Sequence, residues 1–312
     1  MIVTLTANPS LDRAVTLAAP LRPGEVQTAV SSREDAGGKG INVARVVARA
    51  GAPAVAVLPL AEDDPYAAVL TGAGVPLRPV PVRGHARSNV TIVDPTGETT
   101  KLNLLGAELT APERRALIAE VVAASAGARW LVLAGSLPPG AGDGFYVDVI
   151  RAVRAEAGAP LIAVDTSGAP LAAAVADGAP DLIKPNEDEL AELAGTTIPA
   201  DADLVAAVLP LARELVPSRA GAALVTLGGD GAVLVTSDGA WAGRPPAIRL
   251  VSTVGAGDSS LAGYLLADLD GAAPDARLRN SIRYGAAAAS LPGTQAPTHA
   301  DLPDGDVPIR PL

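Results

Sequence analysis

The chain has no cysteine and only two histidines, His85 and His299, among its 312 residues. Disulfides, thiol catalysis and cysteine-ligated metals are therefore excluded, and two histidines so far apart do not predict a histidine-based metal site. Aromatic residues make up only 2% of the sequence, too few for a surface on which nucleic-acid bases stack. Carboxylates, lysines and glycine-rich turns are left as the candidate carriers of chemistry.

Positive charge is also scarce. The sequence has 24 Lys and Arg residues against 34 Asp and Glu residues, a formal net charge of −10. This balance argues against nucleic acid or an anionic membrane surface as a partner. Only three of the basic residues are lysines, namely Lys39, Lys101 and Lys184. Each of them is a candidate for a position that needs a compact ammonium group, and any bound anion must be held locally.

Long apolar runs are missing as well. No segment approaches the ~18 consecutive apolar residues of a membrane span, and the first residues lack the basic region of a signal peptide. We therefore expect a cytoplasmic protein without a membrane partner. With 49% hydrophobic residues, the chain is expected to fold around a sizeable core.

Short β-branched runs alternate with alanine-rich stretches of helical periodicity. Strands are predicted near 2–6, 54–58, 129–134, 160–165, 181–184, 223–227 and 232–236, and helices near 39–51, 111–125, 144–156, 187–194, 202–215, 256–268 and 276–290. The alternation predicts an α/β fold with a mostly parallel, doubly wound sheet and helices on both faces.

Residues 12–36 and 75–105 break this rhythm, because they contain alternating patterns without long helices. They are interpreted as four antiparallel strands of a small sheet that covers a cleft, with the turn of one hairpin at 94–97. No linker composition divides the chain, so residues 1–312 are predicted to form a single domain whose lid comes from about 12–36 and 85–105. The proline-rich tail, 292–312, is expected to be either an ordered surface strap or a frayed end.

The strongest motif is Gly255-Ala256-Gly257-Asp258, where a strand end runs into an apolar helix. A glycine turn that opens a helix directs free backbone N–H groups at one point and so predicts an anion site. Asp258 would lie beside it as a candidate general base. Taken alone, the same residues would also suit a tight connection followed by an acid in the first helical turn. The Walker A and full Gly-x-Gly-x-x-Gly motifs are both absent here.

Two further motifs also precede predicted helices. Gly37-Gly38-Lys39-Gly40 is too glycine-rich for a simple helix start, and Lys39 and Asn42 can face the same side of the first turn. In Lys184-Pro185-Asn186, the asparagine is a candidate N-cap, with Glu189 completing a capping box. Capping explains much of this motif, but carboxylates near Lys184 also suit a nucleotide phosphate with Mg²⁺.

Four segments, in this order and spacing, resemble the motifs of the ribokinase-like PfkB carbohydrate kinases: 8–12, 37–42, 184–189 and 253–258. The resemblance covers nearly the whole chain. Residues 133–140 and the opening Thr-Ala-Asn-Pro-Ser-Leu-Asp are most similar to the 1-phosphofructokinase branch, which acts on phosphorylated ketohexoses. The resemblance implies a three-layer ribokinase-like core with a small β-sheet lid, and ATP and Mg²⁺ as cofactors.

The resemblance also implies roles for individual residues. Asp258 would deprotonate the acceptor hydroxyl, and the amides of Gly255, Ala256 and Gly257 would stabilise the transferring phosphoryl group. Sugar hydroxyls would be held by Asp12, Gly38 and Asn42. The nucleotide would be bordered by Lys184, Asn186, Thr226, Gly228 and Gly231, and Glu189 would organise Mg²⁺ through water together with Asn186.

A substrate that already carries a phosphate needs a second cationic site. The candidates are Arg87, which matches the substrate-phosphate arginine of the family, together with Lys39 and Lys101, and Ser136 is expected to add a hydroxyl or an amide. For Lys101, a solvated face of the strand is an equally good explanation.

The expected reaction is ATP-dependent phosphorylation of fructose 1-phosphate at its C6 hydroxyl, which gives fructose 1,6-bisphosphate. Within the same class, tagatose-6-phosphate kinase or a PfkB-type 6-phosphofructokinase is the alternative, and a non-catalytic sugar-phosphate sensor is the alternative from a different class. An NAD-dependent dehydrogenase would need the dinucleotide fingerprint, which is missing. A homodimer through the lid is also expected, because the lid strands have edges to cover.

Overall fold

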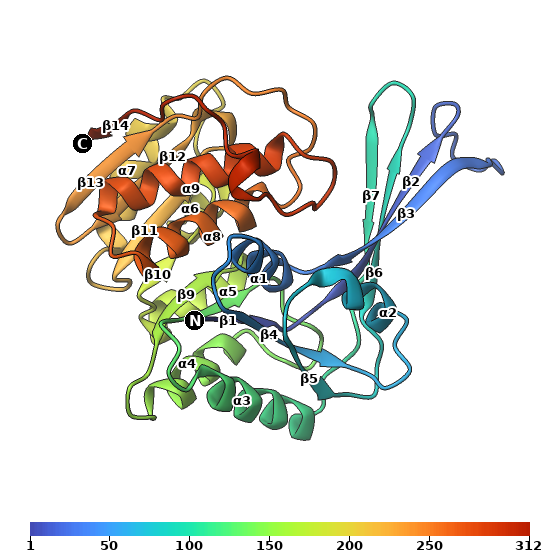
Figure 1. Cartoon of the computed structure of the whole chain (residues 1–312), viewed down its shortest axis with the longest axis horizontal. Coiled ribbons are helices and arrows are strands. Elements are labelled where there is room, and N and C mark those ends of the chain that lie inside the picture. The colour runs from blue at the N-terminus through green and yellow to red at the C-terminus, as the bar shows by residue number, and fades with distance from the viewer.

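The computed structural model describes residues 1–312 and contains two separate sheets (Figure 1). The larger one has ten strands in the order β14-β13-β12-β11-β10-β9-β8-β1-β4-β5. Seven of them, from β5 to β11 in this order, run parallel, and the last three pair antiparallel at one edge. Their bounds are β1 Ile2–Thr6, β4 Ala54–Leu60, β5 Leu77–Pro81, β8 Trp130–Ala134, β9 Leu161–Asp165, β10 Leu182–Ile183, β11 Ala222–Thr226, β12 Ala232–Thr236, β13 Gly239–Gly243 and β14 Ile309–Pro311.

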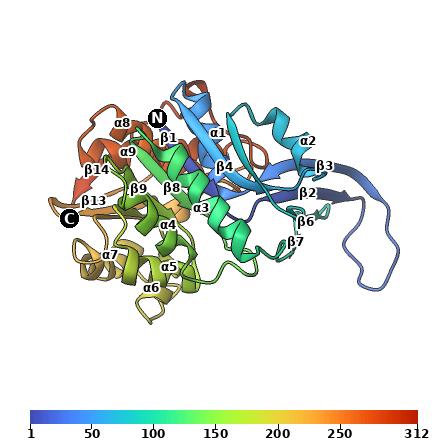
Figure 2. The same cartoon turned by 90° about the horizontal axis from the view of Figure 1, so that it is seen from below.

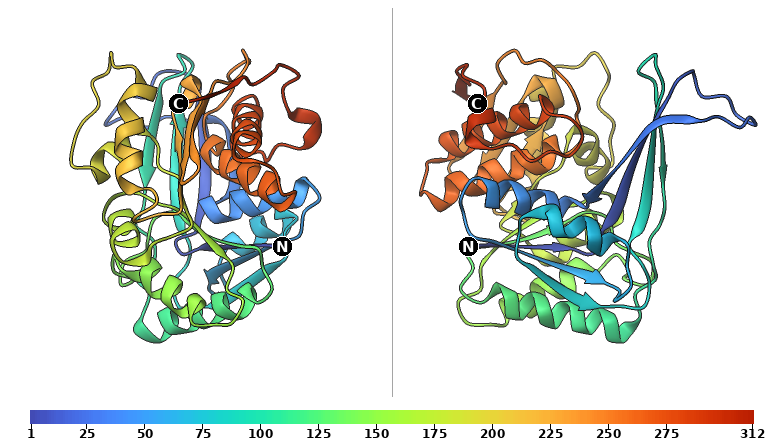
Figure 3. Two further views of the ribbon diagram at one scale, coloured as in Figure 1. Left: turned by 90° about the vertical axis from the view of Figure 1, so that its left-hand side faces the viewer. Right: turned by 45° about the vertical axis from the view of Figure 1, so that its right-hand side comes forward.

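Helices cover both faces of the large sheet (Figures 2 and 3). One face packs on α1 (Lys39–Arg49), α8 (Ala256–Leu269) and α9 (Pro274–Ala289), and the other on α3 (Ala111–Ser125), α4 (Phe145–Arg154), α5 (Gly168–Ala173), α6 (Glu187–Leu193) and α7 (Leu204–Leu215). Each face has its own hydrophobic core. A central strand such as β8 is buried along its whole length, as expected of a parallel strand between two helical layers. The predicted doubly wound α/β fold is confirmed.

The lid is a four-stranded sheet in the order β3-β2-β6-β7, which projects from the carboxyl edge of the large sheet (Figure 1). Its strands are β2 Ser10–Leu17, β3 Ala29–Gly37, β6 Arg87–Val93 and β7 Thr99–Asn103. The smaller sheet was predicted, but the expectation that all its strands are antiparallel is wrong, because the central pair β2 and β6 is parallel. β2 follows β1 and β6 follows β5, so the chain enters the lid from the carboxyl edge of the large sheet both times. The two lid strands therefore run in the same direction.

The sequence patterns missed several short elements. The short helix α2 (Tyr66–Leu70) and the strands β13 and β14 were not predicted, and β5 joins the large sheet although it falls in a stretch interpreted as lid. The C-terminal tail ends on β14, which pairs with β13, so the ordered alternative holds for its last residues. None of the helices is long and apolar enough to span a membrane.

Candidate active site

A cavity of about 870 Å³ lies between the lid and the carboxyl ends of the large sheet. Open α/β sheets bind ligands at this edge, because the loops that follow the strands meet there. Most residues singled out in the sequence line this cavity, although they come from distant parts of the chain: Asp12, Gly38, Lys39, Asn42, Arg87, Lys184, Asn186, Glu189, Thr226, Gly228, Gly231, Gly255, Ala256, Gly257 and Asp258.

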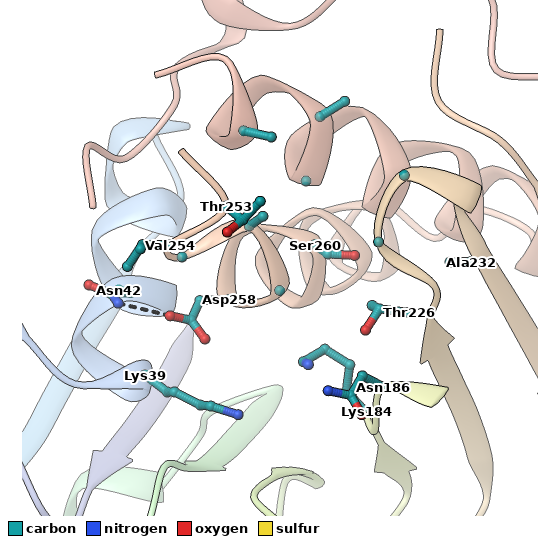
Figure 4. A pocket seen from close by; sticks show the side chains of 18 of the residues that line it. Lys39, Asn42, Lys184, Asn186, Thr226, Ala232, Thr253, Val254, Asp258 and Ser260 are labelled. Atoms are coloured by element: carbon teal, nitrogen blue, oxygen red, sulfur yellow. Dashed lines mark hydrogen bonds between the residues drawn. The ribbon is translucent and has the colours of Figure 1, made fainter. Parts of the chain in front are cut away.

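The N-terminus of α8 forms one wall of this cavity (Figure 4). Gly255 caps the helix with φ +77°, a left-handed conformation that favours glycine. The amides of Gly255, Gly257 and Asp258 have no hydrogen-bond partner in the chain, whereas the amide of Ala256 donates to Thr253 O at 3.3 Å. The helix therefore offers donors for an anion, with Ala256 in part engaged elsewhere.

Asp258 lies in the first turn of α8 and is 6% exposed. Asn42 Nδ2, from α1, donates to Asp258 Oδ2 at 2.8 Å (Figure 4). Burial and the nearby Asp165 carboxylate raise the pKa of Asp258 to about 6, against the lowering effect of Lys39, Asn42 and Lys184. A carboxylate with a pKa near neutrality is suited to accept a proton from an alcohol as a general base.

Asp165 was not singled out in the sequence, although it ends the buried strand β9 at the carboxyl edge. Its side chain is fully buried and holds both lysines of the cavity: Lys39 Nζ lies 2.7 Å from Oδ1 and Lys184 Nζ 3.3 Å from Oδ2. Burial would raise the pKa of Asp165, but the two ammonium groups hold it below its usual range. Its position at a strand end was the signal that could have identified it.

Lys39 is the residue whose contacts differ most from its predicted role. It was assigned to the phosphate of the substrate, but its ammonium group is paired with Asp165 and lies on the same side of Asp258 as Lys184 (Figure 4). Burial by itself would lower the pKa of Lys39, but the carboxylates of Asp165 and Asp258 raise it above its ordinary value. Lys39 therefore stays charged beside the candidate base.

Polar residues of the lid form the opposite end of the cavity. Ser10 Oγ and Asn89 Nδ2 both donate to Asp12 Oδ1, at 2.7 and 2.9 Å, which leaves Oδ2 without a hydrogen bond. Arg87 lies one strand away, and its Nη1 donates to Leu104 O at 3.3 Å. Burial raises the pKa of Asp12 and lowers that of Arg87, while their mutual attraction opposes both shifts. Ser10 and Asn89 are site residues that sequence reasoning missed.

Loops after β10 and β11 line the third part of the cavity. The predicted capping box is present: Glu189 N donates to Asn186 Oδ1 at 2.7 Å, and Asn186 N donates to Glu189 Oε2 at 2.9 Å. Gly231 has φ +101°, and an added Cβ would collide with Gly243 O. The chain here must therefore carry glycine, which lets a ligand approach the backbone closely.

Two predicted residues do not reach this cavity. Lys101 is exposed on the outer strand β7, opposite Thr91, so the solvated-face alternative describes its position. Ser136 follows β8 and lines a separate cavity of about 440 Å³, where its Oγ accepts a hydrogen bond from Asn8 Nδ2 at 3.2 Å. The sequence placed Lys101 on a lid strand and Ser136 after a strand end, but the direction of each side chain depends on tertiary packing.

Comparison with known proteins identifies the family. The description "pfkB family carbohydrate kinase" matches residues 6–304. The chain belongs to the PfkB family. It is 36% identical to the 1-phosphofructokinase of Rhodobacter capsulatus, over 91% of this chain and 90% of that protein. It is 34% identical to the ATP-dependent 6-phosphofructokinase isozyme 2 of Escherichia coli, over 96% of both chains.

Solved structures extend the agreement from sequence to fold. A phosphofructokinase-2 of Escherichia coli, solved in complex with substrates and products, superposes on this PfkB kinase with a TM-score of 0.87 at 33% identity, over 96% of both chains. The tetrameric inhibited form of the same enzyme gives 0.86. Membership of the family makes this protein a phosphotransferase that acts on a sugar hydroxyl, with ATP as donor and a divalent metal.

Proposed function

We propose that this PfkB kinase transfers the γ-phosphoryl group of ATP to the C6 hydroxyl of fructose 1-phosphate and produces fructose 1,6-bisphosphate. The observation that carries the proposal is a cavity with a buried base and free amides at its centre, and with an arginine and a carboxylate, Arg87 and Asp12, at its lid end. In a protein of net charge −10, a half-buried arginine beside polar acceptors supports a local site for an anionic sugar.

The proposed reaction uses groups that already face one another. Asp258 accepts the proton of the sugar hydroxyl while the hydroxyl oxygen forms a bond to the γ-phosphorus of ATP. The bond between the γ-phosphorus and the β-phosphate oxygen breaks at the same time, which releases ADP. The amides of Gly255 and Gly257 and the ammonium group of Lys184 stabilise the charge that develops on the phosphoryl oxygens. Asp12 and Asn42 orient the sugar. The nucleotide is bordered by residues at the end of β11 and in the loops after β10 and β11: Lys184, Asn186, Thr226, Gly228 and Gly231.

We propose Mg²⁺ as the divalent metal. Mg²⁺ is commonly held by one or two carboxylates together with substrate phosphates and waters, so it needs no all-protein cluster. The capping box uses Glu189 Oε2 and leaves Oε1 without a hydrogen bond, and Glu189 lines the cavity, so its carboxylate fits this mode of binding. Glu189 would hold the ion through water, and the ion would neutralise charge on the nucleotide phosphates.

A substrate panel tests this function. We expect ADP release with ATP and Mg²⁺ to give the highest kcat/KM for fructose 1-phosphate, compared with fructose 6-phosphate, tagatose 6-phosphate and free fructose. Preference for fructose 6-phosphate would leave the roles of the base and the amides unchanged but would make the protein a PfkB-type 6-phosphofructokinase. The 34% identity with such an enzyme is the observation that favours this alternative. No turnover of any sugar would support the sensor hypothesis.

Arg87→Ala tests recognition of the substrate phosphate. Losing a charged hydrogen-bond donor should raise KM for the phosphosugar by roughly ten- to a hundredfold, with KM for ATP nearly unchanged. Parallel rises of both KM values would mean that the variant is damaged as a whole and that Arg87 has no selective role.

We also propose that residues 1–312 work as a single catalytic domain and that two copies associate through their lids in the cytoplasm, where ATP and phosphosugars are available. Exposed apolar side chains on and beside the lid support the association: Val26, Val30, Leu102, Leu104 and Leu105. The outer strands β3 and β7 also leave edges unpaired. Light scattering on the wild type and on Leu102→Glu tests it, since a mass of 31.0 kDa for both would contradict a lid dimer.

A further inference from the structure

Asp64 and Tyr66 lie outside the cavity and connect two of the points where the lid joins the core. Tyr66 is 1% exposed, and its hydroxyl donates to Gly37 O, at the end of β3, at 2.7 Å. Asp64 is 5% exposed; its Oδ1 accepts from Tyr66 N at 2.9 Å and its Oδ2 from Ala86 N at 2.6 Å. The turn before α2 and the first residue of that helix therefore hold the end of one lid strand and the start of another. We name Asp64 and Tyr66 the hinge bracket.

Neighbouring contacts reinforce this bracket. His85 Nε2 lies 3.0 Å from Asp63 Oδ1 at the surface, directly beside the buried contact between Asp64 and Ala86. Helix α2 also packs against β2 and β3. The bracket thus contacts both lid hairpins, one through β3 and the other through the residues that lead into β6. A buried carboxylate that accepts two backbone amides is a rigid connection, because breaking it leaves buried polar groups unpaired.

Both backbone groups held by the bracket adjoin the lid end of the cavity. Ala86 directly precedes Arg87. Gly37 faces Asp12 so closely that an added Cβ would collide with the Asp12 carboxylate. In the lid sheet, Ser10 pairs with Gly37 on one side and with Arg87 on the other. A shift of either hinge would therefore move Arg87 relative to Asp12, and displacements of about 1 Å are enough to weaken a binding site.

We propose that Asp64 and Tyr66 are positioning residues that set the affinity for the phosphosugar by bracing the lid at Gly37 and Ala86. The proposal rests on the proposed function in so far as Asp12 and Arg87 bind that substrate. Neither bracket residue lines the cavity, so neither touches substrate. The bracket acts on the lid end of the site and leaves the nucleotide loops, which belong to the other half of the large sheet, unaffected.

Kinetics of Tyr66→Phe test the bracket, because this variant keeps the ring and loses only the donor to Gly37. We expect KM for the phosphosugar to rise roughly three- to tenfold, the fold-change of one lost hydrogen bond, with kcat and KM for ATP within about twofold. Asp64→Asn, which keeps a single acceptor oxygen, should have the same selective effect. Tyr284→Phe is the matched control, since Tyr284 is equally buried but contacts His299, away from the lid.

Hydrogen exchange of the substrate-free protein separates the bracket from the proposed function. Asp64→Asn should speed exchange at Ala86, and both bracket variants should speed it at 10–12 and 35–37, while Tyr284→Phe should not. If these rates rise but the wild type phosphorylates no phosphosugar, the proposed function fails and the bracket stands. If the rates stay at wild-type values, or if KM for ATP rises in parallel with KM for the phosphosugar, the bracket is overturned.

Discussion

The two ends of helix α8 each carry a buried aspartate, and their surroundings differ sharply. At the N-terminal end, Asp258 accepts one side-chain hydrogen bond, from Asn42, and its pKa is raised to about 6. At the C-terminal end, Asp268 is 4% exposed. Trp130 Nε1 and Arg129 Nε donate to its Oδ2 at 2.7 and 3.0 Å, and Arg277 Nη1 forms an ion pair with its Oδ1 at 2.9 Å. One carboxylate is left reactive and the other is neutralised.

This difference shows how one helix can serve both stability and chemistry. A carboxylate at the C-terminus of a helix is unfavourable next to the helix dipole unless cations compensate it, and two arginines do so at Asp268. They attach α8 to the start of β8 and to α9. Because these contacts hold the C-terminal end of α8, the helix stays in position although its N-terminal end carries unpaired amides and a buried base.

Asp258→Asn should destroy activity and leave the fold intact. Loss of the general base is expected to lower kcat roughly a hundred- to ten-thousandfold with little change in KM for either substrate. In the folded chain the pKa of Asp258 lies above its ordinary value, so ionisation costs stability as the pH rises from about 4 to about 6, and this cost persists above that range. The variant should therefore unfold at a Tm no lower than that of the wild type at pH 7.5. Steady-state kinetics and thermal denaturation check both expectations, and near-normal turnover would remove Asp258 from its role.

The same substitution at the other end, Asp268→Asn, should have the opposite profile. It removes the charge that two arginines surround, so the free energy of unfolding should fall by about 2–3 kcal/mol. Once folded, the enzyme should keep kcat and both KM values within about twofold. Chemical denaturation and kinetics on one preparation measure this, and a kinetic defect as large as that of Asp258→Asn would contradict the division between the two ends.

The pH dependence of kcat/KM in the wild type should report the ionisation of Asp258, at the N-terminal end of α8, and not that of Asp268. Because Asp258 must be ionised to accept a proton, kcat/KM should be constant above its pKa and fall about tenfold per pH unit below about 6. Rates measured between pH 4.5 and 8.5, at saturating Mg²⁺ and within the range in which the protein stays folded, give the curve. A rate that does not change between pH 5 and 8 would show that no group with this pKa is required.

Asn42→Ala should increase the difference between the two aspartates of α8, because it removes the side-chain hydrogen bond of Asp258 and leaves the contacts of Asp268 in place. The hydrogen bond from Asn42 favours the ionised form of Asp258, so its loss should move the midpoint of the pH profile to a higher pH. We expect a shift of roughly half a unit to one unit, together with a modest loss of sugar affinity. Its control is the profile of Asp268→Asn, which should keep the wild-type midpoint. An unchanged midpoint in Asn42→Ala would mean that the hydrogen bond does not tune the base.

Sequence reasoning found the elements of the site more reliably than their contacts. Asp258 and Asn42 were both predicted in the site, but no pattern indicates a hydrogen bond between residues 216 positions apart. Lys39 was predicted in the site, but its pairing with Asp165, a residue in another βα unit, could not be read from the sequence. The hinge bracket was not predicted, because the short helix α2 lacks a clear periodic pattern and because Asp64 and Tyr66 contact backbone groups of the lid.

The layers of this protein follow from the sequence alone, because strand and helix periodicities are local and the glycine motifs fix the conformation of the turns that carry them. The sequence also placed the base and the anion-binding turn on one helix start. Which charged groups meet depends on the tertiary fold. Packing in a buried site brings Asp165 between two lysines, leaves Asp258 with one side-chain donor, and surrounds Asp268 with two arginines and a tryptophan. Electrostatics in a low-dielectric interior depend on such distances, which sequence separation does not contain.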